Sequence, residues 1–521
     1  MIRLSDHLYI EPMGKVLDEA RQKRAAGRPL KRYAAANVNR QNADWTTRPM
    51  SANWSLYRNL ATLRARARQM AKDSPHFRKY LEMCKSNIIG AKGIQLQCRA
   101  RIGRGGSLNR VLNKRIEEAF WEWGHRETAT VSGKLDWLGA QRLFVEQLVR
   151  DGEVLIQHID ADNRFGYAMK FWNVDYLDET YNDELPGGNR VIMSVEFDRA
   201  DRPAAYWLTT PASDINFTRR RTRQRVRIPA DQMSHAFLVN DDETQARGVT
   251  WFHAALLHAK DLHEYTGGVV LSARVAAYSM GFLKKAAPDE TQFTGQENDE
   301  GYPEQVAIDV APVSFNELPD GYELQQFDPK QPTQNHSEFK RSMLVDVATG
   351  LGVNYFSLAG DMSDVNYSSA RVGLGEERDG WCAFQNFVAT HFCREVYQRW
   401  LRSASMRGAI DVTPRQFQEL MNPMWRPRGW RYVDPQKEVN AEVLALQNNL
   451  ATYTDIFADR GIDINEWLET KAMEKTQFEE YGIDYGPTPA AGVADEPDDE
   501  DEPPPADDEE RGYANGKYHV N

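Results

Sequence analysis

Apolar residues recur at helical spacing in the N-terminal third of this chain. In residues 55–70 three leucines share one helical face and four arginines occupy the remainder, which predicts an amphipathic helix with a basic surface. A second helix should begin at the capping residue Ser74 and end at Gly90. Residues 107–123 and 135–150 carry the same periodicity and predict two more helices. The leucines are Leu56, Leu60 and Leu63, and the arginines are Arg58, Arg64, Arg66 and Arg68.

Between residues 153 and 209 the pattern changes to short runs rich in β-branched and aromatic residues. Gly, Asn, Asp and Pro separate these runs, which is typical of an antiparallel sheet and predicts an α+β region. The arginines that follow alternate with uncharged residues, so in a strand all four would project from one face. Such a face either protects a sheet edge from self-pairing or binds phosphate or an acidic surface. The predicted strands are 153–158, 167–172, 190–197 and 204–209, and the alternating arginines are Arg221, Arg223, Arg225 and Arg227.

The second half of the chain returns to helical patterns. Residues 251–283 are rich in alanine and leucine and predict one long or bent helix. Residues 286–332 are rich in Pro, Asp and Gln and predict a small insertion of low helical content. Helix resumes at 335–349, and a glycine-bearing loop then separates it from a long helix through residues 368–400. A final helical group is predicted at 434–481.

Length and charge limit this plan. With 521 residues the chain is long enough for more than one hydrophobic core. The formal net charge of -12 is concentrated in residues 493–511, where 11 Asp and Glu accompany one Arg, so the remainder is nearly neutral. We expect residues 487–521 to form a disordered acidic tail, either solubilising or used to capture a basic partner. Residues 1–52 are polar and poorly periodic, and predict a partly disordered arm that becomes ordered on a partner.

The sequence offers no catalytic constellation. The nearest approach to a phosphate-binding loop has Thr128 in place of the first glycine and Leu135 in place of the hydroxyl residue that binds magnesium. The three histidines of residues 253–263 are spaced by five, and a helix turns each about 140° from the last, so they share no ligand face. We therefore expect no enzyme activity, no bound metal and no cofactor. The cysteines, which we expect to be buried apolar side chains, are Cys84, Cys98, Cys382 and Cys393.

Four stretches carry more specific information than composition does. The most specific is NYFSLAGDMSDVNYSSAR at 354–371, because its aromatic-Ser-Leu-x-x-Asp and Asn-Tyr-Ser-Ser-Ala-Arg elements are hard to match by chance. The others are LRARAR at 63–68 with the following NIIGAKGIQLQ, RDGEV at 150–154, and WRYVDPQKEVNAEVLALQNNLATYTDIFADRG at 430–461. In order and spacing they resemble the lambda-type portal proteins of tailed phages, from about Tyr33 to Gly482. The arm and the acidic tail lie outside this similarity.

The resemblance implies an α+β portal fold that assembles into a ring, usually of twelve copies. Each subunit of that fold has long stem and wing helices, small β-containing wing and clip regions, and a helical C-terminal crown. The helical and strand patterns fit this plan. We therefore expect a wing domain at 53–250, a wing helix leading into the first stem helix at 251–285, the clip at 286–332, the second stem helix at 333–351, a channel loop at 352–367, a long wing helix with further wing at 368–433, and crown-like helices at 434–486.

In portals a loop at this place projects toward the DNA. Here the loop contains aspartates and asparagines but no Lys or Arg. Cationic side chains would bind successive phosphates, whereas neutral or acidic ones let a polyanion slide. The alternative is that these residues only shape a turn and cap the next helix, with Asp364 or Asn366 as the cap. The predicted channel-loop residues are Asn354, Tyr355, Asp361, Asp364, Asn366 and Tyr367.

The function that the resemblance implies is that of a portal at one capsid vertex, through which double-stranded DNA is packaged and ejected. The implied partners are further copies of the chain, the terminase large subunit, major capsid and scaffold proteins, and neck or head-completion proteins, with no membrane. The protein would be assembled in the host cytoplasm and act in the virion. The arginines of residues 64–68 and 221–227 are then expected in contacts between subunits or with the capsid. Two alternatives stay open, namely a neck or scaffold-type adaptor without a channel and a magnesium-dependent nuclease.

Overall fold

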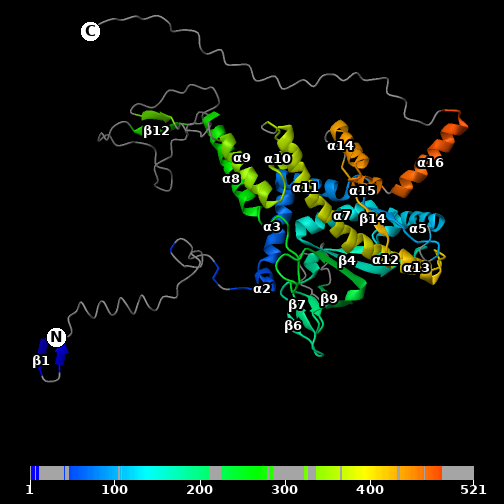
Figure 1. Cartoon of the computed structure of the whole chain (residues 1–521). Coiled ribbons are helices and arrows are strands. Elements are labelled where there is room, and N and C mark those ends of the chain that lie inside the picture. The colour runs from blue at the N-terminus through cyan, green and yellow to red at the C-terminus, as the bar shows by residue number, and fades with distance from the viewer. Residues whose placement is uncertain are drawn as a thin grey trace, which may run out of the picture. The chain divides into compact units, whose positions relative to one another are not determined.

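A computed structural model of the chain divides into two compact units, unit 1 at Met1–Arg428 and unit 2 at Gly429–Asn521 (Figure 1). The acidic tail predicted at 487–521 lies outside the described residues, as do most of the predicted arm and most of the insertion at 286–332. The described residues are 2–5, 8–10, 40, 46–47, 49–103, 106, 108–209, 225–277, 281–285, 322–326, 336–363, 366–430, 435–460, 462 and 464–483.

Unit 1 combines helices with antiparallel sheets, so the predicted α+β class is confirmed. Two short π-helical segments, η2 (Lys85–Ile89) and η5 (Ala389–Cys393), continue helices without a break in the chain direction. The α-helices of unit 1 are α2 (Ala52–Tyr57), α3 (Leu60–Asp73), α4 (Pro75–Cys84), α5 (Arg110–Trp123), α6 (Arg126–Ala129), α7 (Trp137–Asp151), α8 (Leu256–Ala277), α9 (His336–Gly350), α10 (Tyr355–Ala359), α11 (Tyr367–Val388), α12 (Arg394–Met406) and α13 (Pro414–Leu420).

Two antiparallel sheets form the centre of unit 1. The three-stranded sheet has the order β11-β4-β5, and the five-stranded sheet has the order β10-β9-β8-β7-β6. Their strands are β4 (Glu153–Asp160), β5 (Tyr167–Trp172), β6 (Asp183–Glu184), β7 (Arg190–Ile192), β8 (Val195–Phe197), β9 (Pro203–Thr209), β10 (Arg225–Pro229) and β11 (Met233–Phe237). Three two-stranded sheets pair β1 (Ile2–Ser5) with β2 (Leu8–Ile10), β3 (Gln95–Gln97) with β14 (Met424–Arg426), and β12 (Gly281–Lys285) with β13 (Tyr322–Gln326).

One predicted strand is a hairpin instead. The run 190–197 forms β7 and β8, which pair antiparallel, and Met193 and Ser194 between them have φ angles of 47° and 70°. The prediction of a single strand is wrong. Turns with positive φ usually contain glycine, asparagine or aspartate, and neither Met193 nor Ser194 is one of these residues, so their identity does not signal the turn. The two residues are held by their surroundings, since both are buried.

The helix predicted at 135–150 shows how local signals set its ends. Asp136 caps α7 by accepting a hydrogen bond from the backbone N–H of Gly139 at 2.6 Å. At the other end Gly152 takes a left-handed φ of 87°, and a Cβ there would meet the carbonyl carbon of Val249 at 2.1 Å. Only glycine fits this position, where α7 turns directly into β4.

An aromatic core joins the helices of unit 1 to the three-stranded sheet. The Phe120 ring of α5 lies 5.1 Å from Trp400 of α12 and 5.3 Å from Trp137 of α7, both measured between centroids. Phe392, in η5, stacks between Trp137 and Phe144. Helix α12 also contacts β4 and β5. Helices α5, α7 and α12 and segment η5 are therefore held together by one set of rings.

The predicted helix 55–70 is divided in the structure. Helix α2 ends at Tyr57 and α3 begins at Leu60, with Arg58 and Asn59 between them. Leu56 and Leu60 are buried, as the pattern predicts. The arginines, however, do not share one exposed face, because Arg64 is only 1% exposed while Arg66 is exposed.

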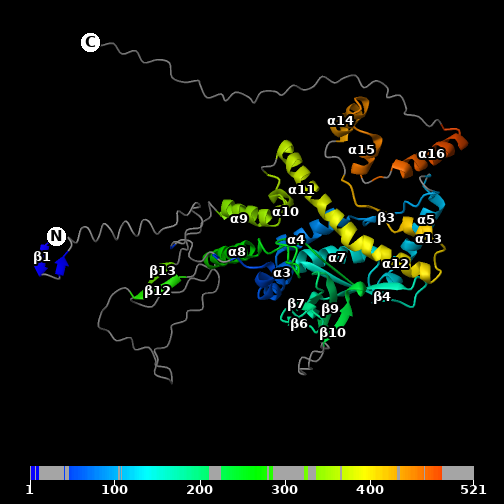
Figure 2. The same ribbon diagram turned by 60° about the horizontal axis from the view of Figure 1, so that its bottom comes forward.

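Helices α8 and α9 pack side by side as a hairpin, and the run α11–η5–α12 forms one long rod across unit 1 (Figures 1 and 2). The helix predicted at 251–283 is shorter than expected, because residues 251–255 form turns before α8 and residues 281–285 form β12. Helix α9 matches the prediction at 335–349 within one residue. No helix in the described part of the chain is long and apolar enough to cross a membrane.

Unit 2 contains three helices among its described residues. They are α14 (Pro435–Gln447), α15 (Tyr453–Asp459) and α16 (Ile464–Glu480), and α15 packs against α16. The Phe457 and Trp467 rings stack with centroids 4.7 Å apart. Apolar side chains such as Leu450, Leu468 and Met473 are each more than half exposed, so this unit has little core of its own.

Candidate functional site

The predicted channel loop is more ordered than its glycine content suggests. After α9, the backbone turns at Gly352 and then forms the short helix α10, which ends at Gly360 with a left-handed φ of 74°. Residues 360–366 then connect α10 to α11, and we call this segment the connecting loop. Asp364, within it, lies outside the described residues. Helix α10 was not predicted, because five residues are too few to show helical periodicity.

Asp361 is held by its own loop. One carboxylate oxygen accepts a hydrogen bond from the Tyr355 hydroxyl at 2.9 Å, and the other accepts from the Ser363 backbone N–H at 3.1 Å and from the Ser363 hydroxyl. The Ser363 hydroxyl bond is the largest of the effects that lower the pKa of Asp361 to about 2. Asp361 therefore remains negatively charged at all physiological pH values.

The nearest basic groups lie on neighbouring helices. The Arg341 guanidinium of α9 sits over the Tyr355 ring, 5.4 Å from its centroid. The Lys79 amine of α4 comes close to Gly360, because a Cβ built at that glycine would lie 3.2 Å from it. The carboxylate of Asp361, in the described part of the connecting loop, thus has cationic groups of α4 and α9 in its neighbourhood.

Asn366 acts as a helix cap. Its side-chain oxygen accepts hydrogen bonds from the backbone N–H and the hydroxyl of Ser369, both at 2.8 Å, at the start of α11. This is the capping role that the sequence left open for Asp364 or Asn366. The side chain of Tyr367, another predicted loop residue, lies outside the described part of the structure.

Asn354 lies across from α11. Its side-chain amide donates to the Gly373 carbonyl at 2.7 Å and to a Glu377 carboxylate oxygen at 3.0 Å. The predicted loop residues are therefore divided by the structure, with Tyr355 and Asp361 touching each other and Asn354 facing the next helix. Glu377 was not singled out from the sequence, where it is one of several charged residues in a helical run.

Two of the predicted basic contacts are used inside the subunit. Arg64 donates to Glu153 at 3.2 Å and to Asp175 at 2.5 Å, and Arg68 donates to Asp151 at 2.7 Å. Arg64 is buried, so the structure does not place it on the basic surface that the helix pattern predicts. The reason is that Glu153 of β4 and two carboxylates from the segment after β5, Asp175 and Glu179, neutralise it, so that burial carries no unpaired charge.

Glu153 is the centre of this buried network. It is fully buried and accepts bonds from Arg247 at 2.6 and 2.8 Å and is bonded to the His235 ring at 2.9 Å. Burial alone would raise the pKa of Glu153, but the Arg247 charge and the His235 hydrogen bond outweigh it and hold the pKa far below its usual value. The network joins α3, β4, β11 and the segment before α8.

The alternating arginines of β10 are also engaged within the subunit. Arg227 makes a two-pronged pair with buried Glu196, at 2.8 and 2.9 Å, and Arg225 donates to Asp178 at 2.8 Å. Their side chains remain 44% and 40% exposed, so part of each is still on the surface. Arg221 and Arg223 lie outside the described residues.

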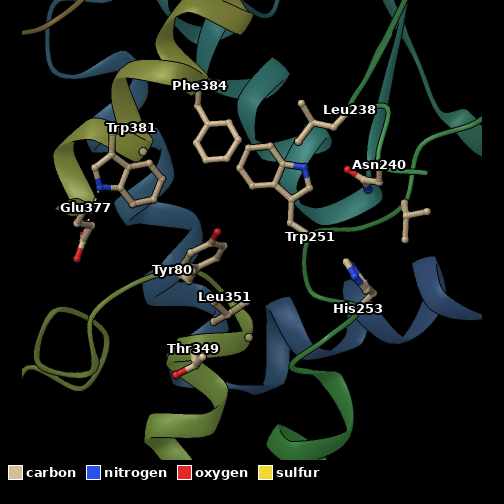
Figure 3. A pocket seen from close by; sticks show the side chains of 14 residues that line it. Tyr80, Leu238, Asn240, Trp251, His253, Thr349, Leu351, Glu377, Trp381 and Phe384 are labelled. Carbon is tan, nitrogen blue, oxygen red and sulfur yellow. Dashed lines mark hydrogen bonds between the residues drawn. The ribbon is translucent and has the colours of Figure 1, made fainter. Parts of the chain in front are cut away.

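A pocket of about 370 Å³ lies where the turn before α8, the end of α9, and helices α4 and α11 meet (Figure 3). Trp251 stands in its centre and packs against Phe384, with the ring centroids 4.4 Å apart and the rings tilted by 33°. Glu377 and Trp381 line the α11 side. The pocket therefore lies beside the contact between Asn354 and Glu377.

Metal ligands and cysteines are two further groups of residues that could carry chemistry. Among the described residues, no three His, Cys, Asp or Glu side chains are grouped as metal ligands. The expectation that all four cysteines are buried is wrong for Cys382, which is exposed on α11, because this part of the helix has one face away from the core.

The sequence of residues 38–385 matches the family model described as phage portal protein, lambda family. The chain belongs to this family. Its relatives include the probable portal protein of Halomonas phage phiHAP-1, which is 30% identical over 457 residues and 87% of each chain. The portal protein of Escherichia phage N15 is 22% identical over 84% of this chain and 88% of its own.

A solved structure with similarity is a chain from the neck of an empty gene transfer agent particle, computed with C6 symmetry. It is 12% identical with a TM-score of 0.39, and the match covers 81% of this chain and 97% of that chain.

The matched range of this portal protein covers both the connecting loop and the Glu153 network. The family is one of structural proteins, in agreement with the expectation from the sequence. Two of the motifs behind the resemblance meet in space, since LRARAR supplies Arg64 and Arg68 and RDGEV supplies Asp151 and Glu153. These motifs therefore encode an internal ion-pair network.

Proposed function

We propose that this portal protein forms a ring, of twelve copies by the family's usual number, at one capsid vertex, and that double-stranded DNA passes through the ring during packaging and ejection. Family membership supports the role. The structural observation behind this proposal is the α8–α9 hairpin, which is followed by α10 and then by the connecting loop with the ionised Asp361.

The exposed apolar residues of the hairpin favour self-association. Val270 and Leu271 of α8 are 44% and 61% exposed, and Phe339 and Val345 of α9 are 45% and 41% exposed. Exposed apolar surface on both helices of one hairpin is costly in water and is stabilised when a neighbour covers it. Because α8 and α9 lie side by side, copies that pack head to tail would bury the α8 surface of one subunit and the α9 surface of the next.

Asp361 gives the connecting loop its proposed function. A carboxylate that stays ionised repels the phosphates of a duplex, so contact with DNA would be steric and brief. The loop would guide the duplex without holding it. Asn366 keeps the start of α11 intact beside this contact by capping it.

We propose that the regions follow the plan expected from the sequence. In this proposal the hairpin α8–α9 belongs to the stem, residues 286–332 with β13 form the clip, the sheets and aromatic core belong to the wing, and unit 2 is the crown. We propose that the clip region contacts the terminase large subunit during packaging and neck proteins afterwards, and that the wing contacts the major capsid and scaffold proteins. Assembly would take place in the host cytoplasm before the portal acts in the virion. Arg66, which is exposed, and the exposed parts of Arg225 and Arg227 are the remaining candidates for contacts between subunits or with the capsid.

Ring formation is tested by electron microscopy and native mass spectrometry of purified protein. Wild-type protein should give closed rings. Leu271→Glu should reduce ring yield strongly, because it places a charge in the proposed contact, whereas Val111→Glu on α5, where Val111 is 83% exposed, should assemble normally. Monomers of wild-type protein at every salt concentration would refute the ring.

The channel is tested by deleting residues 361–365 and measuring DNA packaged per particle. Rings should form, but packaging or retention of DNA should fail. Normal packaging by this deletion would favour the adaptor without a channel.

A further inference from the structure

The first turns of α11 have little contact with the rest of the subunit. From Ser368 to Gly380 no described side chain is buried, and Trp381 is the first buried residue of the helix. Gly375 and Gly380 face open space, since a Cβ at either would meet no atom within 4 Å. Whatever fixes the direction of this half of α11 must therefore be a small number of contacts.

Asn354 provides such contacts from the end of the α9 segment. Besides its two amide hydrogen bonds to Gly373 and Glu377, its backbone N–H donates to the same Glu377 oxygen at 3.3 Å. Asn354 also begins α10, so it belongs to the backbone that leads into the connecting loop.

Gly373 makes this approach possible. A Cβ at this position would lie 3.0 Å from the Asn354 side-chain oxygen, which is closer than ordinary packing allows. Without a side chain at residue 373, the asparagine amide can reach the helix carbonyl. The absence of a side chain at Gly373 thus leaves the space that the Asn354 amide occupies.

The other oxygen of Glu377 is tied to the core. It accepts a hydrogen bond from the Trp381 indole N–H at 3.2 Å, one turn further along α11. Trp381 is 4% exposed and lies 6.2 Å from Phe384, which packs against Trp251. Figure 3 shows Glu377 and Trp381 on the same helix at the border of the pocket. One carboxylate thus links Asn354 to the group of rings formed by Trp381, Phe384 and Trp251.

We propose that Glu377 is a positioning residue that, with Asn354, latches the first half of α11 to the end of the α9 segment and thereby sets the place of the connecting loop. Glu377 does not contact DNA in this role. It determines where Asp361 stands relative to the helix hairpin. The consequence for DNA rests on the proposed function, whereas the latch itself is a property of the subunit.

Hydrogen–deuterium exchange of the assembled protein tests the latch directly. In Glu377→Ala, amides of residues 367–377 should exchange about tenfold faster, the factor expected when a hydrogen bond to a charged group is lost. Peptides from β4, β5 and α7 should be unchanged. Glu376→Ala removes the same charge from an exposed neighbour on α11 and should exchange like wild type.

A pair of substitutions at residues 354 and 377 distinguishes the latch from a general structural role. Asn354→Asp should also accelerate exchange, because two carboxylates then face each other. Combining it with Glu377→Gln removes the repulsion between the carboxylates and lets the glutamine amide donate to the new carboxylate. Exchange should then return part of the way to wild type, because the bond from residue 354 to the Gly373 carbonyl stays lost. Unaltered exchange in Glu377→Ala, or no recovery in the double variant, would overturn the latch.

The effect on DNA is measured in particles built with each variant. Glu377→Ala should form rings and package less DNA, while Glu376→Ala packages normally. If deletion of residues 361–365 leaves packaging intact, the proposed function fails although exchange can still demonstrate the latch. If the deletion blocks packaging but Glu377→Ala behaves as wild type in exchange and packaging, the latch fails and the proposed function stands.

Discussion

Glu153 and Asp361 are two carboxylates with lowered pKa values, and they are stabilised in opposite ways. Glu153 is fully buried and depends on Arg247, Arg64 and His235, which come from distant parts of the chain. Asp361 lies at the surface and depends on hydrogen bonds from Tyr355 and Ser363, within six residues of it.

This difference in how the two carboxylates are stabilised distinguishes a rigid region, around Glu153, from a region that is free to shift, around Asp361. A buried ion needs its partners to offset the loss of hydration, so its network resists any displacement of the elements it joins. The hydrogen-bond donors of Asp361 belong to residues 355–363 and move together with it. The connecting loop and α10 can therefore shift together while Asp361 stays ionised. The first arrangement suits the interior of unit 1, and the second suits the contact with a moving polyanion that we propose for the connecting loop.

The largest expected effect is the removal of a partner from Glu153. Arg247→Met should lower the free energy of unfolding by about 3 to 5 kcal/mol, because it leaves a buried carboxylate short of charge. Denaturant titration measures this change. Arg66→Met, which alters an exposed arginine, should stay within about 0.5 kcal/mol of wild type. Equal losses in both variants would show that burial of Glu153 has no special role.

The pH dependence of stability comes next. The pKa of Glu153 in the folded protein lies below the ordinary value of 4.5, so its contribution is present above about pH 4.5 and is lost as the pH falls below it. Denaturant titrations at pH 7 and pH 3 should differ by about 2 to 3 kcal/mol more in wild type than in Glu153→Gln. The same pH dependence in both proteins would contradict the assignment.

The loss of stability on breaking a partly exposed ion pair should lie between the losses expected at Glu153 and at Asp361. Arg227→Ala should destabilise by about 1 kcal/mol, since Glu196 is buried but keeps hydrogen bonds from Asn189 at 2.7 Å and Trp207 at 3.0 Å. Arg190→Ala is the control, because Arg190 and Asp201 are both about half exposed and their pair should contribute less than about 0.5 kcal/mol. Thermal unfolding of the two variants would reveal whether burial of one partner sets the difference.

The smallest effect on stability is expected at Asp361. Asp361→Asn keeps an oxygen for the Ser363 bonds and should leave the unfolding transition unchanged. Its effect should appear only in DNA passage, where Asp361→Lys is the stronger variant because a cation binds phosphates. Particles with lysine should package more slowly at low salt than at high salt. A loss of folding stability in Asp361→Asn would show that Asp361, like Glu153, stabilises the fold, and would contradict the contrast between them.

Much of the local structure could be predicted from the sequence. Capping by Asp136, the left-handed Gly152 and the aromatic residues of β5 are short-range signals, and each determines a conformation within a few residues. The helix of residues 336–350 was also predictable from its periodicity. Even the connecting loop could be located, because glycine, aspartate and asparagine cluster there between two helical runs.

The tertiary structure alone decided which charges are exposed. Arg64 and Arg66 stand two residues apart in the same repeat, yet one is buried against Glu153 and the other is exposed. Nothing within the repeat distinguishes them, because the partner lies 89 residues away and is brought near by packing. The same holds for Asn354 and Glu377, whose hydrogen bond depends on the path of α11. Periodicity reports the faces of an element, whereas electrostatic pairing depends on what the fold places opposite each face.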